Sequence, residues 1–95
     1  MLTEKCKKEF FDFRYKNVKW NEEDVQMFYE DTLIEQQAWM VAFFDTVDIY
    51  VNALRYNKTY FQPLCNHLLH EKYETRSEAL KQAFMQANKI YNERV

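Results

Sequence analysis

Apolar residues near the start of the chain recur at the spacing of one helix face. The stripe consists of Leu2, Cys6, Phe10 and Phe13. At 100° per residue these positions lie on one side of a helix, and charged residues fill the other side. The pattern therefore predicts an amphipathic helix over residues 3–17. Asn17 is the expected end, because asparagine tolerates the left-handed backbone conformation that often stops a helix.

A second apolar pattern begins after Asn21, which is a favourable N-cap residue. No helix-breaking residue occurs before Asn57, so the pattern predicts one continuous helix over residues 22–56. At ~1.5 Å per residue this helix would be about 52 Å long. A strand over residues 47–51 is the alternative, because Val47, Ile49 and Val51 alternate there with Asp48 and Tyr50. The absence of flanking turn residues favours the helix.

The middle of this predicted helix, from Ala38 to Val51, is apolar on nearly all sides. A few short helices cannot cover such a surface, and soluble monomers seldom expose an apolar patch of several hundred Å². We therefore expect a second copy of the chain to cover it in a homodimer. The predicted dimer interface consists of Trp39, Met40, Phe43, Phe44, Val47, Tyr50 and Val51.

A capping-box pattern marks the start of a third predicted helix. Thr59 is followed three residues later by Gln62, and Pro63 then falls in the first turn, where its missing N–H costs little. Apolar residues at helical spacing follow as far as Tyr73. The sequence thus predicts a short helix between about residues 60 and 73.

The last predicted helix spans residues 76–93 and begins with a second capping box, Thr75 followed by Glu78. Together these elements predict an all-α fold. We expect a small antiparallel helical bundle of three to four helices, with one long central helix, in a single domain over residues 1–95.

The composition excludes several classes of enzyme. The chain contains no glycine, and therefore no P-loop, no dinucleotide-binding fingerprint and no nucleophile elbow. Its single serine, Ser77, lies between two charged residues and fits no serine hydrolase pattern. Cys6 and Cys65 form no C-x-x-C pair, so we expect two buried, reduced thiols.

Two observations bear on the compartment. The N-terminal charges are not followed by the apolar stretch of a signal peptide. The longest uninterrupted apolar run, residues 38–44, is far shorter than the ~20 residues of a membrane-spanning helix. The sequence therefore predicts a soluble, cytoplasmic protein without a membrane partner.

Charge is unevenly distributed, although the net charge is only −2. Residues 20–57 hold eight acidic residues against Arg55 alone, and both flanking segments are basic. One explanation is that an acidic helix packs between basic helices and fixes their order. The other is that the acidic helix faces a basic partner protein, which would raise the association rate and the selectivity.

The second explanation leads to a function. We expect a small non-catalytic protein-interaction module, an inhibitor or adaptor of the size that bacteriophages and mobile elements encode as accessory proteins. It would present the acidic helical surface to a basic surface of its partner, with Trp20 as an aromatic anchor. The predicted acidic partner-binding residues are Glu22, Glu23, Asp24, Glu30, Asp31 and Glu35.

Two pairs of acidic residues suggest an enzyme instead. Asp45 and Asp48 lie in the most apolar segment, and Glu71 and Glu74 repeat their spacing in the next predicted helix. Four such carboxylates on facing helices could hold Mg²⁺ for a nucleotide phosphate. The pairing resembles that of the all-α nucleotide pyrophosphohydrolases of the MazG type, but the motifs stand in a different order. We expect no catalytic residue, metal or cofactor.

A last alternative is nucleic-acid binding. Basic and aromatic residues interleave over residues 5–20, a composition typical of platforms for nucleic acids. Most of these aromatic residues fall on the apolar stripes, however, and two acidic residues interrupt the basic face. The pattern therefore favours a helix that packs one face into the core and exposes the opposite face to solvent.

Overall fold

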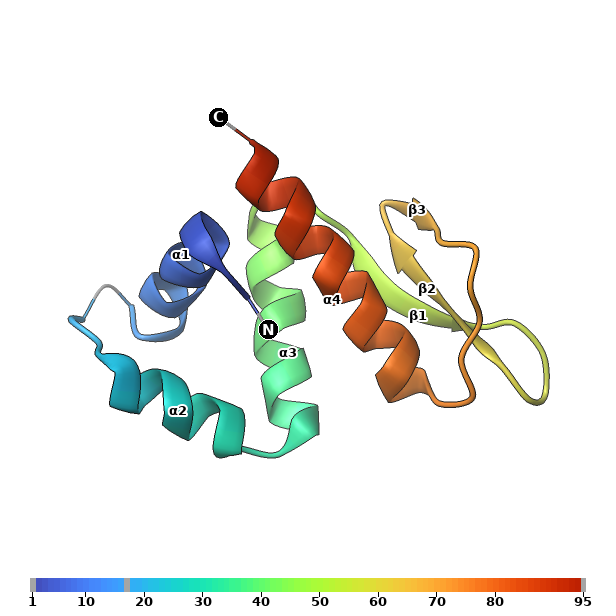
Figure 1. The fold of residues 1–95 in the computed structure, drawn as a ribbon, viewed down its shortest axis with the longest axis horizontal. Coiled ribbons are helices and arrows are strands. Elements are labelled where there is room, and N and C mark those ends of the chain that lie inside the picture. The colour runs from blue at the N-terminus through green and yellow to red at the C-terminus, as the bar shows by residue number, and fades with distance from the viewer. Residues whose placement is uncertain (1, 17, 95) are drawn as a thin grey trace.

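The computed structural model describes residues 2–16 and 18–94, which form four helices and one three-stranded antiparallel sheet (Figure 1). The elements are α1 (Glu4–Arg14), α2 (Glu22–Glu30), α3 (Leu33–Thr46), β1 (Val51–Arg55), β2 (Phe61–Cys65), β3 (His67–Leu68) and α4 (Arg76–Glu93). The fold is therefore of the α+β class, and the all-α helical bundle predicted from the sequence is wrong. Two features account for the difference: the long predicted helix is broken in two places, and a sheet forms where helix was predicted.

Helix α1 lies inside the predicted range, and its apolar stripe is buried as expected. Leu2, Cys6 and Phe10 are buried and Phe13 is half-buried, and Phe11 beside this stripe is also fully buried. The helix ends at Arg14. The end predicted at Asn17 lies outside the described residues.

The predicted helix over residues 22–56 is wrong, because three separate elements occupy that range. The first break follows α2, where Asp31 adopts an extended conformation with φ −69° and ψ 169°. Thr32 then caps α3, its side chain accepting a hydrogen bond from the N–H of Glu35 at 3.3 Å. Threonine followed three residues later by glutamate is a helix-start pattern, which the continuous apolar spacing concealed.

The second break ends α3 with a Schellman motif. The N–H of Ile49 bonds the carbonyl of Phe44 at 3.0 Å, and the N–H of Asp48 bonds the carbonyl of Asp45 at 3.5 Å. Asp48 has a φ of 60°, in the left-handed position that glycine usually occupies. Ile49 and Phe44 are fully buried, which supplies the apolar contact typical of this motif. A helix thus ends without glycine or proline.

The helix predicted over residues 60–73 is also wrong, because this segment forms β2, β3 and a loop. In the register of β1 and β2, Val51 pairs with Cys65 and Arg55 with Phe61. The turn between these strands is held by Asn57, whose Oδ1 accepts the N–H groups of Thr59 and Tyr60, both at 2.8 Å. Asn57 therefore lies just after the end of a strand, in a hairpin turn, and not at the end of a helix as predicted.

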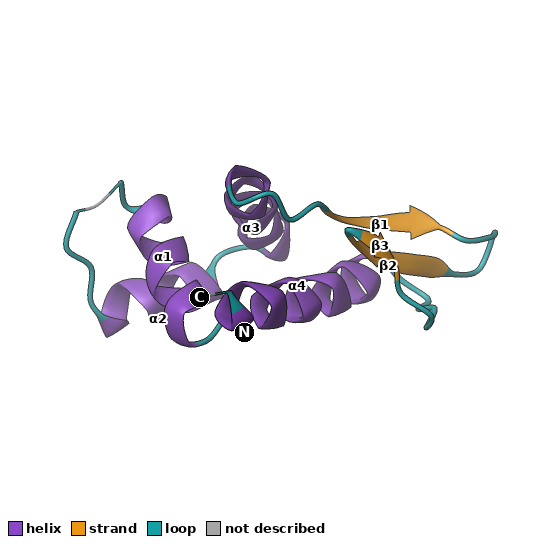
Figure 2. Cartoon of the chain, turned by 90° about the horizontal axis from the view of Figure 1, so that it is seen from above, coloured by secondary structure: helices purple, strands orange, loops and turns teal. Residues whose placement is uncertain are grey.

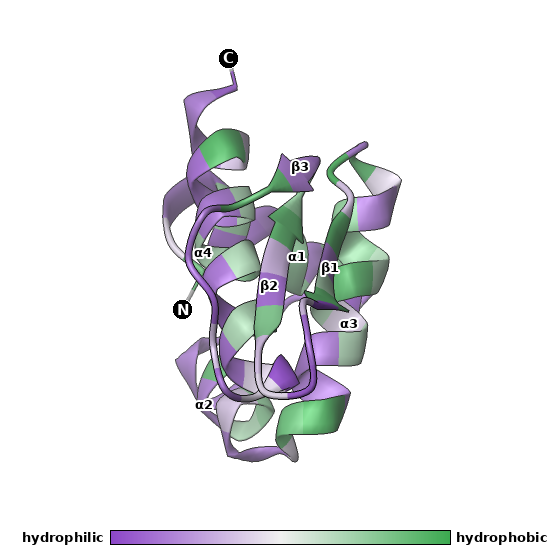
Figure 3. Cartoon of the chain, turned by 90° about the vertical axis from the view of Figure 1, so that its right-hand side faces the viewer, coloured by the Kyte–Doolittle hydropathy of each residue, from purple (hydrophilic) through white to green (hydrophobic). Residues whose placement is uncertain are grey.

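Pro63 lies inside β2 without leaving an unsatisfied carbonyl. Its own carbonyl accepts the N–H of Leu69 at 2.9 Å. The carbonyl of Leu69 would normally accept the N–H that proline lacks. The Nε2 of Gln62 donates to it at 2.7 Å instead. Figure 3 shows a hydrophilic band within β2, between more apolar parts of the strand.

Helix α4 has the bounds predicted from the sequence, and its N-cap Thr75 accepts the N–H of Glu78 at 3.1 Å. It lies along one face of the sheet (Figure 2) and contacts both β1 and β2. Its other end reaches the start of α1. There Asn92 Oδ1 accepts the N–H of Cys6 at 2.7 Å, and Asn92 Nδ2 donates to the carbonyl of Thr3 at 3.0 Å.

A single cluster of aromatic rings joins the helices in the core. The ring of Phe10 meets those of Phe11, Phe28 and Phe43 edge-on, with centroids 5.0, 5.2 and 5.6 Å away. Edge-to-face contacts of this kind stabilise the fold beyond the burial of area alone.

Both cysteines are free and buried, as predicted. Burial raises the pKa of the Cys6 thiol to about 12, with a further contribution from the nearby Glu9. The thiol of Cys65 also has a raised pKa because of burial. In residues 2–16 and 18–94, no helix combines the length and apolar character that crossing a membrane requires.

Candidate functional site

The most exposed part of the acidic segment is the turn between α2 and α3. All residues from 30 to 35 are exposed, and so is the outer face of α2. We call this surface the acidic corner. It consists of Glu23, Met27, Glu30, Asp31, Leu33, Ile34 and Glu35.

Four predicted partner-binding residues, Glu23, Glu30, Asp31 and Glu35, are exposed here. None forms an ion pair within the described part of the chain. The carboxylate of Asp31 accepts one hydrogen bond, from the N–H of Thr32 at 3.2 Å. These carboxylates are therefore free to meet cations from another molecule.

The other three predicted residues are engaged within the fold. Glu22 forms an ion pair with Lys7 at 3.3 Å, and Asp24 completes a capping box at the start of α2. Trp20 is half-buried, and its Nε1 donates to Asp12 at 2.9 Å. The polar groups of these three residues thus have partners within the fold.

Large apolar side chains accompany the free carboxylates on the acidic corner. Ile34 is 81% exposed, Met27 66% and Leu33 53%. A single exposed apolar residue needs no explanation, but several on adjoining ends of two helices are typical of an interaction surface. The pattern along the chain did not single out Met27 and Ile34, although both lie close to the acidic residues of this segment.

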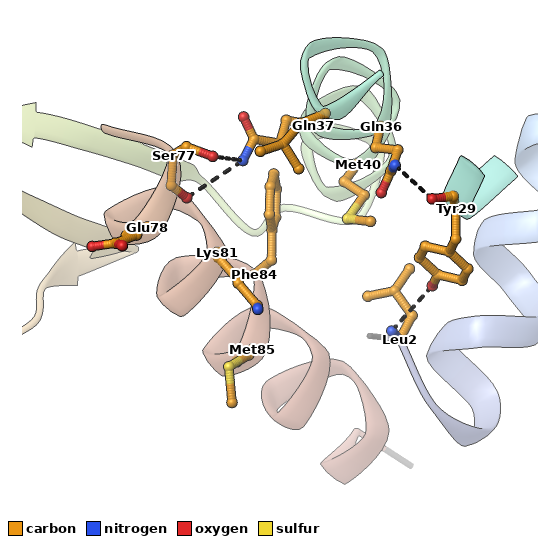
Figure 4. A pocket seen from close by; sticks show the side chains of 11 residues that line it. Leu2, Tyr29, Gln36, Gln37, Met40, Ser77, Glu78, Lys81, Phe84 and Met85 are labelled. Carbon is orange, nitrogen blue, oxygen red and sulfur yellow. Dashed lines mark hydrogen bonds between the residues drawn. The ribbon is translucent and has the colours of Figure 1, made fainter. Parts of the chain in front are cut away.

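A cavity of about 400 Å³ adjoins the corner, between α3 and α4 (Figure 4). Leu33 belongs to both the corner and the cavity wall. The remaining lining residues are Leu2, Tyr29, Gln36, Gln37, Met40, Ser77, Glu78, Lys81, Phe84 and Met85. They come from segments far apart in the sequence, so no pattern along the chain indicates the cavity.

Amide side chains fix the walls of this cavity. Gln36 Nε2 donates to the carbonyls of Tyr29 at 3.1 Å and Asp31 at 2.8 Å, which joins the end of α2 to the start of α3. Gln37 Nε2 donates to Ser77 Oγ at 3.2 Å and so connects α3 with α4. Burial raises the pKa of Tyr29, so its hydroxyl stays protonated at the cavity edge.

The predicted dimer interface lies mostly inside one chain. Met40, Phe43, Phe44 and Val51 are buried in the core, because α3 is short and α1, α4 and the sheet pack around it. Trp39 and Val47 are half-buried and Tyr50 is exposed. Helix α3 is therefore largely covered within one chain and gives no support for a dimer, so the homodimer stays a prediction.

The carboxylates of the proposed magnesium site do not gather. Asp45 and Asp48 are exposed at the end of α3, and Glu71 and Glu74 lie in the loop before α4. Among the described residues, no group of three or more His, Cys, Asp or Glu side chains is placed to hold a metal ion. Although Asp45 and Asp48 lie in the most apolar segment of the sequence, they are thus surface residues.

The basic and aromatic segment of residues 5–20 uses its aromatic residues internally. Phe10 and Phe11 are fully buried, and Trp20 is bonded to Asp12. Arg14 places its guanidinium 4.3 Å from the ring centroid of Trp39. The aromatic residues thus pack within the fold, which leaves little for a nucleobase to stack on.

Fold and site together define a small α+β protein with an acidic, partly apolar corner beside a cavity. No family model, curated protein or solved structure matches the chain.

Proposed function

We propose that the chain is a non-catalytic protein-interaction module, an inhibitor or adaptor that binds a basic partner protein through the acidic corner. One observation carries the proposal: strongly exposed apolar side chains and unpaired carboxylates share the acidic corner. Ile34 and Met27 stand out as apolar, and Glu30 and Glu35 as acidic.

The two kinds of residue would act differently on binding. Burying an exposed aliphatic side chain such as Ile34 contributes about 1.5–3 kcal/mol, which supplies affinity. The carboxylates around it attract a basic surface and raise the association rate, since opposite charges steer the encounter. A basic partner surface with an apolar centre would satisfy both.

The test compares two variants with the same change in charge. In the corner variant, Glu23→Gln, Glu30→Gln, Asp31→Asn and Glu35→Gln neutralise the acidic corner. In the control variant, the same number of exposed carboxylates elsewhere is neutralised: Glu4→Gln, Asp45→Asn, Glu74→Gln and Glu93→Gln.

The partner is first captured by the wild-type chain from its native host cells and identified by mass spectrometry, and the association kinetics are then measured. We expect the corner variant to associate on the order of tenfold more slowly at low salt, with a smaller difference at high salt, and the control to keep most of the wild-type rate. Equal rates for the corner variant and the wild type would contradict the proposal.

A further inference from the structure

We propose that the cavity between α3 and α4 binds a large apolar side chain from an amphipathic basic helix of the partner. This inference rests on the proposed function, and it identifies the structural class of the partner segment. The helix would place its basic residues over the acidic corner and its apolar residue in the cavity.

The cavity has the size and lining of an anchor site. Its volume of about 400 Å³ falls in the range of ligand pockets, roughly 300–1,000 Å³. Met40 and Phe84 are buried in its walls, whereas Leu33 and Met85 are 53% and 50% exposed. Figure 4 shows these walls, with Met40 on α3 and Phe84 and Met85 on α4. Methionine side chains adapt to apolar groups of different shape, so the walls suit a leucine or phenylalanine side chain.

Charge favours a basic occupant of this surface. Glu78 at the cavity is exposed, as are Glu30, Asp31 and Glu35 on the adjoining corner. Lys81 is the one cation among the described lining residues. The lining itself thus balances one carboxylate against one cation, and the excess of negative charge comes from the adjoining corner, which complements a segment rich in lysine or arginine.

The position of Leu33 connects the two surfaces. It lines the cavity and follows Asp31 by two residues, so one short segment can contact both sites. Successive turns of a helix are ~5.4 Å apart, which lets apolar residues four positions apart point to the same side. An amphipathic helix therefore matches this arrangement better than an isolated side chain.

The probes are two fluorescein-labelled, lysine-rich helical peptides. One carries leucine at two positions four residues apart, and the other carries alanine at both. Fluorescence anisotropy measures their affinities for the wild-type chain. We expect the leucine peptide to bind on the order of tenfold more tightly than the alanine peptide, since its side chains enter an apolar site. Equal affinities would overturn the inference.

Two variants locate this preference. Met85→Trp fills the cavity mouth, and Lys89→Trp places the same side chain on α4 outside this cavity. We expect Met85→Trp to abolish the preference for leucine and Lys89→Trp to retain it, with thermal unfolding showing that both variants fold. Retention of the preference in folded Met85→Trp would overturn the inference.

A substitution that does not alter the apolar walls provides a second, independent check. Lys81→Glu removes the lining cation, and we expect it to tighten the binding of both peptides several-fold at low salt. Unchanged affinities would place the peptides away from the cavity and overturn the inference.

The corner variant separates this inference from the proposed function. We expect it to weaken the binding of both peptides equally and to leave the preference for leucine intact. If it binds both peptides as the wild type does, the proposed function fails. If it loses binding while folded Met85→Trp behaves as the wild type, only the cavity inference fails.

Light scattering tests whether a second copy of the chain occupies the cavity. A dimer mass that Met85→Trp converts to 11.8 kDa would assign the cavity to a second copy and overturn the inference.

Discussion

At the residue scale, the chain makes left-handed turns without glycine. Among the described residues, Glu4, Lys16, Asp48 and Asn66 have positive φ angles, from 53° to 63°. Asparagine and aspartate tolerate this conformation better than other side chains because they are short and can form local hydrogen bonds. Asn66 illustrates this, since its Oδ1 accepts the N–H of Tyr50 at 2.8 Å and its own N–H donates to the carbonyl of Tyr50 at 2.8 Å.

A pair of glycine substitutions at the end of α3 tests this conformational difference. Asp48→Gly should raise the free energy of unfolding by about 0.5–1 kcal/mol, because glycine adopts a positive φ without steric cost. Asp45→Gly, inside the helix, should lower it by about 0.3–0.5 kcal/mol, because aspartate is itself a weak helix former. Urea denaturation of both variants measures the two effects. Destabilisation by both substitutions would show that Asp48 is not under backbone strain.

At the element scale, the sequence predicts the two outer helices well. α1 and α4 each combine an uninterrupted helical period with polar residues on the opposite face, and Thr75 marks the start of α4. Both signals are local, so a reading of neighbouring residues is sufficient to find them.

Neighbouring residues do not predict the elements in the middle of the chain, because the ends of these elements depend on side chains in unusual roles. Asp48 takes the place of glycine, and Gln62 supplies the donor that Pro63 lacks. The apolar spacing continues from α3 into Ile49, which is buried as part of a loop. The spacing of apolar residues shows which positions are buried, but not in which element they lie. Here Phe44 of α3, Ile49 of the loop and Val51 of β1 are buried one after another.

The sequence likewise predicts one part of the candidate site and not the other. The concentration of acidic residues between residues 20 and 57 predicts where the acidic corner lies. The cavity depends on the packing of α3 against α4, which brings Gln37 next to Ser77. No pattern within either helix indicates that contact.

The α2–α3 turn provides a test at this scale. The Gln36 amide donates to the carbonyls of Tyr29 and Asp31. A carboxylate cannot donate to them when ionised, so Gln36→Glu should destabilise the fold by about 1–3 kcal/mol. Gln26→Glu, on the exposed face of α2, is the matched control and should change stability by less than about 0.5 kcal/mol. Urea denaturation measures both. Equal stabilities of the two variants would mean that the Gln36 amide does not hold this turn.

At the scale of the whole molecule, side chains of α4 close the fold by bonding the first turn of α1. The amide of Cys6 lies in that turn, where backbone N–H groups have no partner within the helix. Asn92 supplies the acceptor, from 86 positions further along the chain. A terminal helix is therefore secured by side-chain hydrogen bonds as well as by apolar packing.

Substitution of this asparagine should loosen α1 selectively. We expect Asn92→Ala to lower the free energy of unfolding by about 1–3 kcal/mol and to accelerate hydrogen exchange at the Cys6 amide. Lys89→Ala, an exposed residue of the same helix, serves as the control. NMR detection of amide exchange distinguishes the two. An unchanged Cys6 exchange rate in Asn92→Ala would show that water replaces the asparagine without loss.

The bond between Cys6 and Asn92 also sets the order of events during synthesis. A ribosome adds ~5–20 residues per second, so the 86 positions between them take about 4–17 s. Throughout this interval the Cys6 amide lacks its acceptor, although Phe10 can already pack against Phe28 of α2 and Phe43 of α3. The contacts of α1 with earlier helices can therefore form before its contact with α4. α1 completes its docking in one late step, after translation has delivered the last turns of α4.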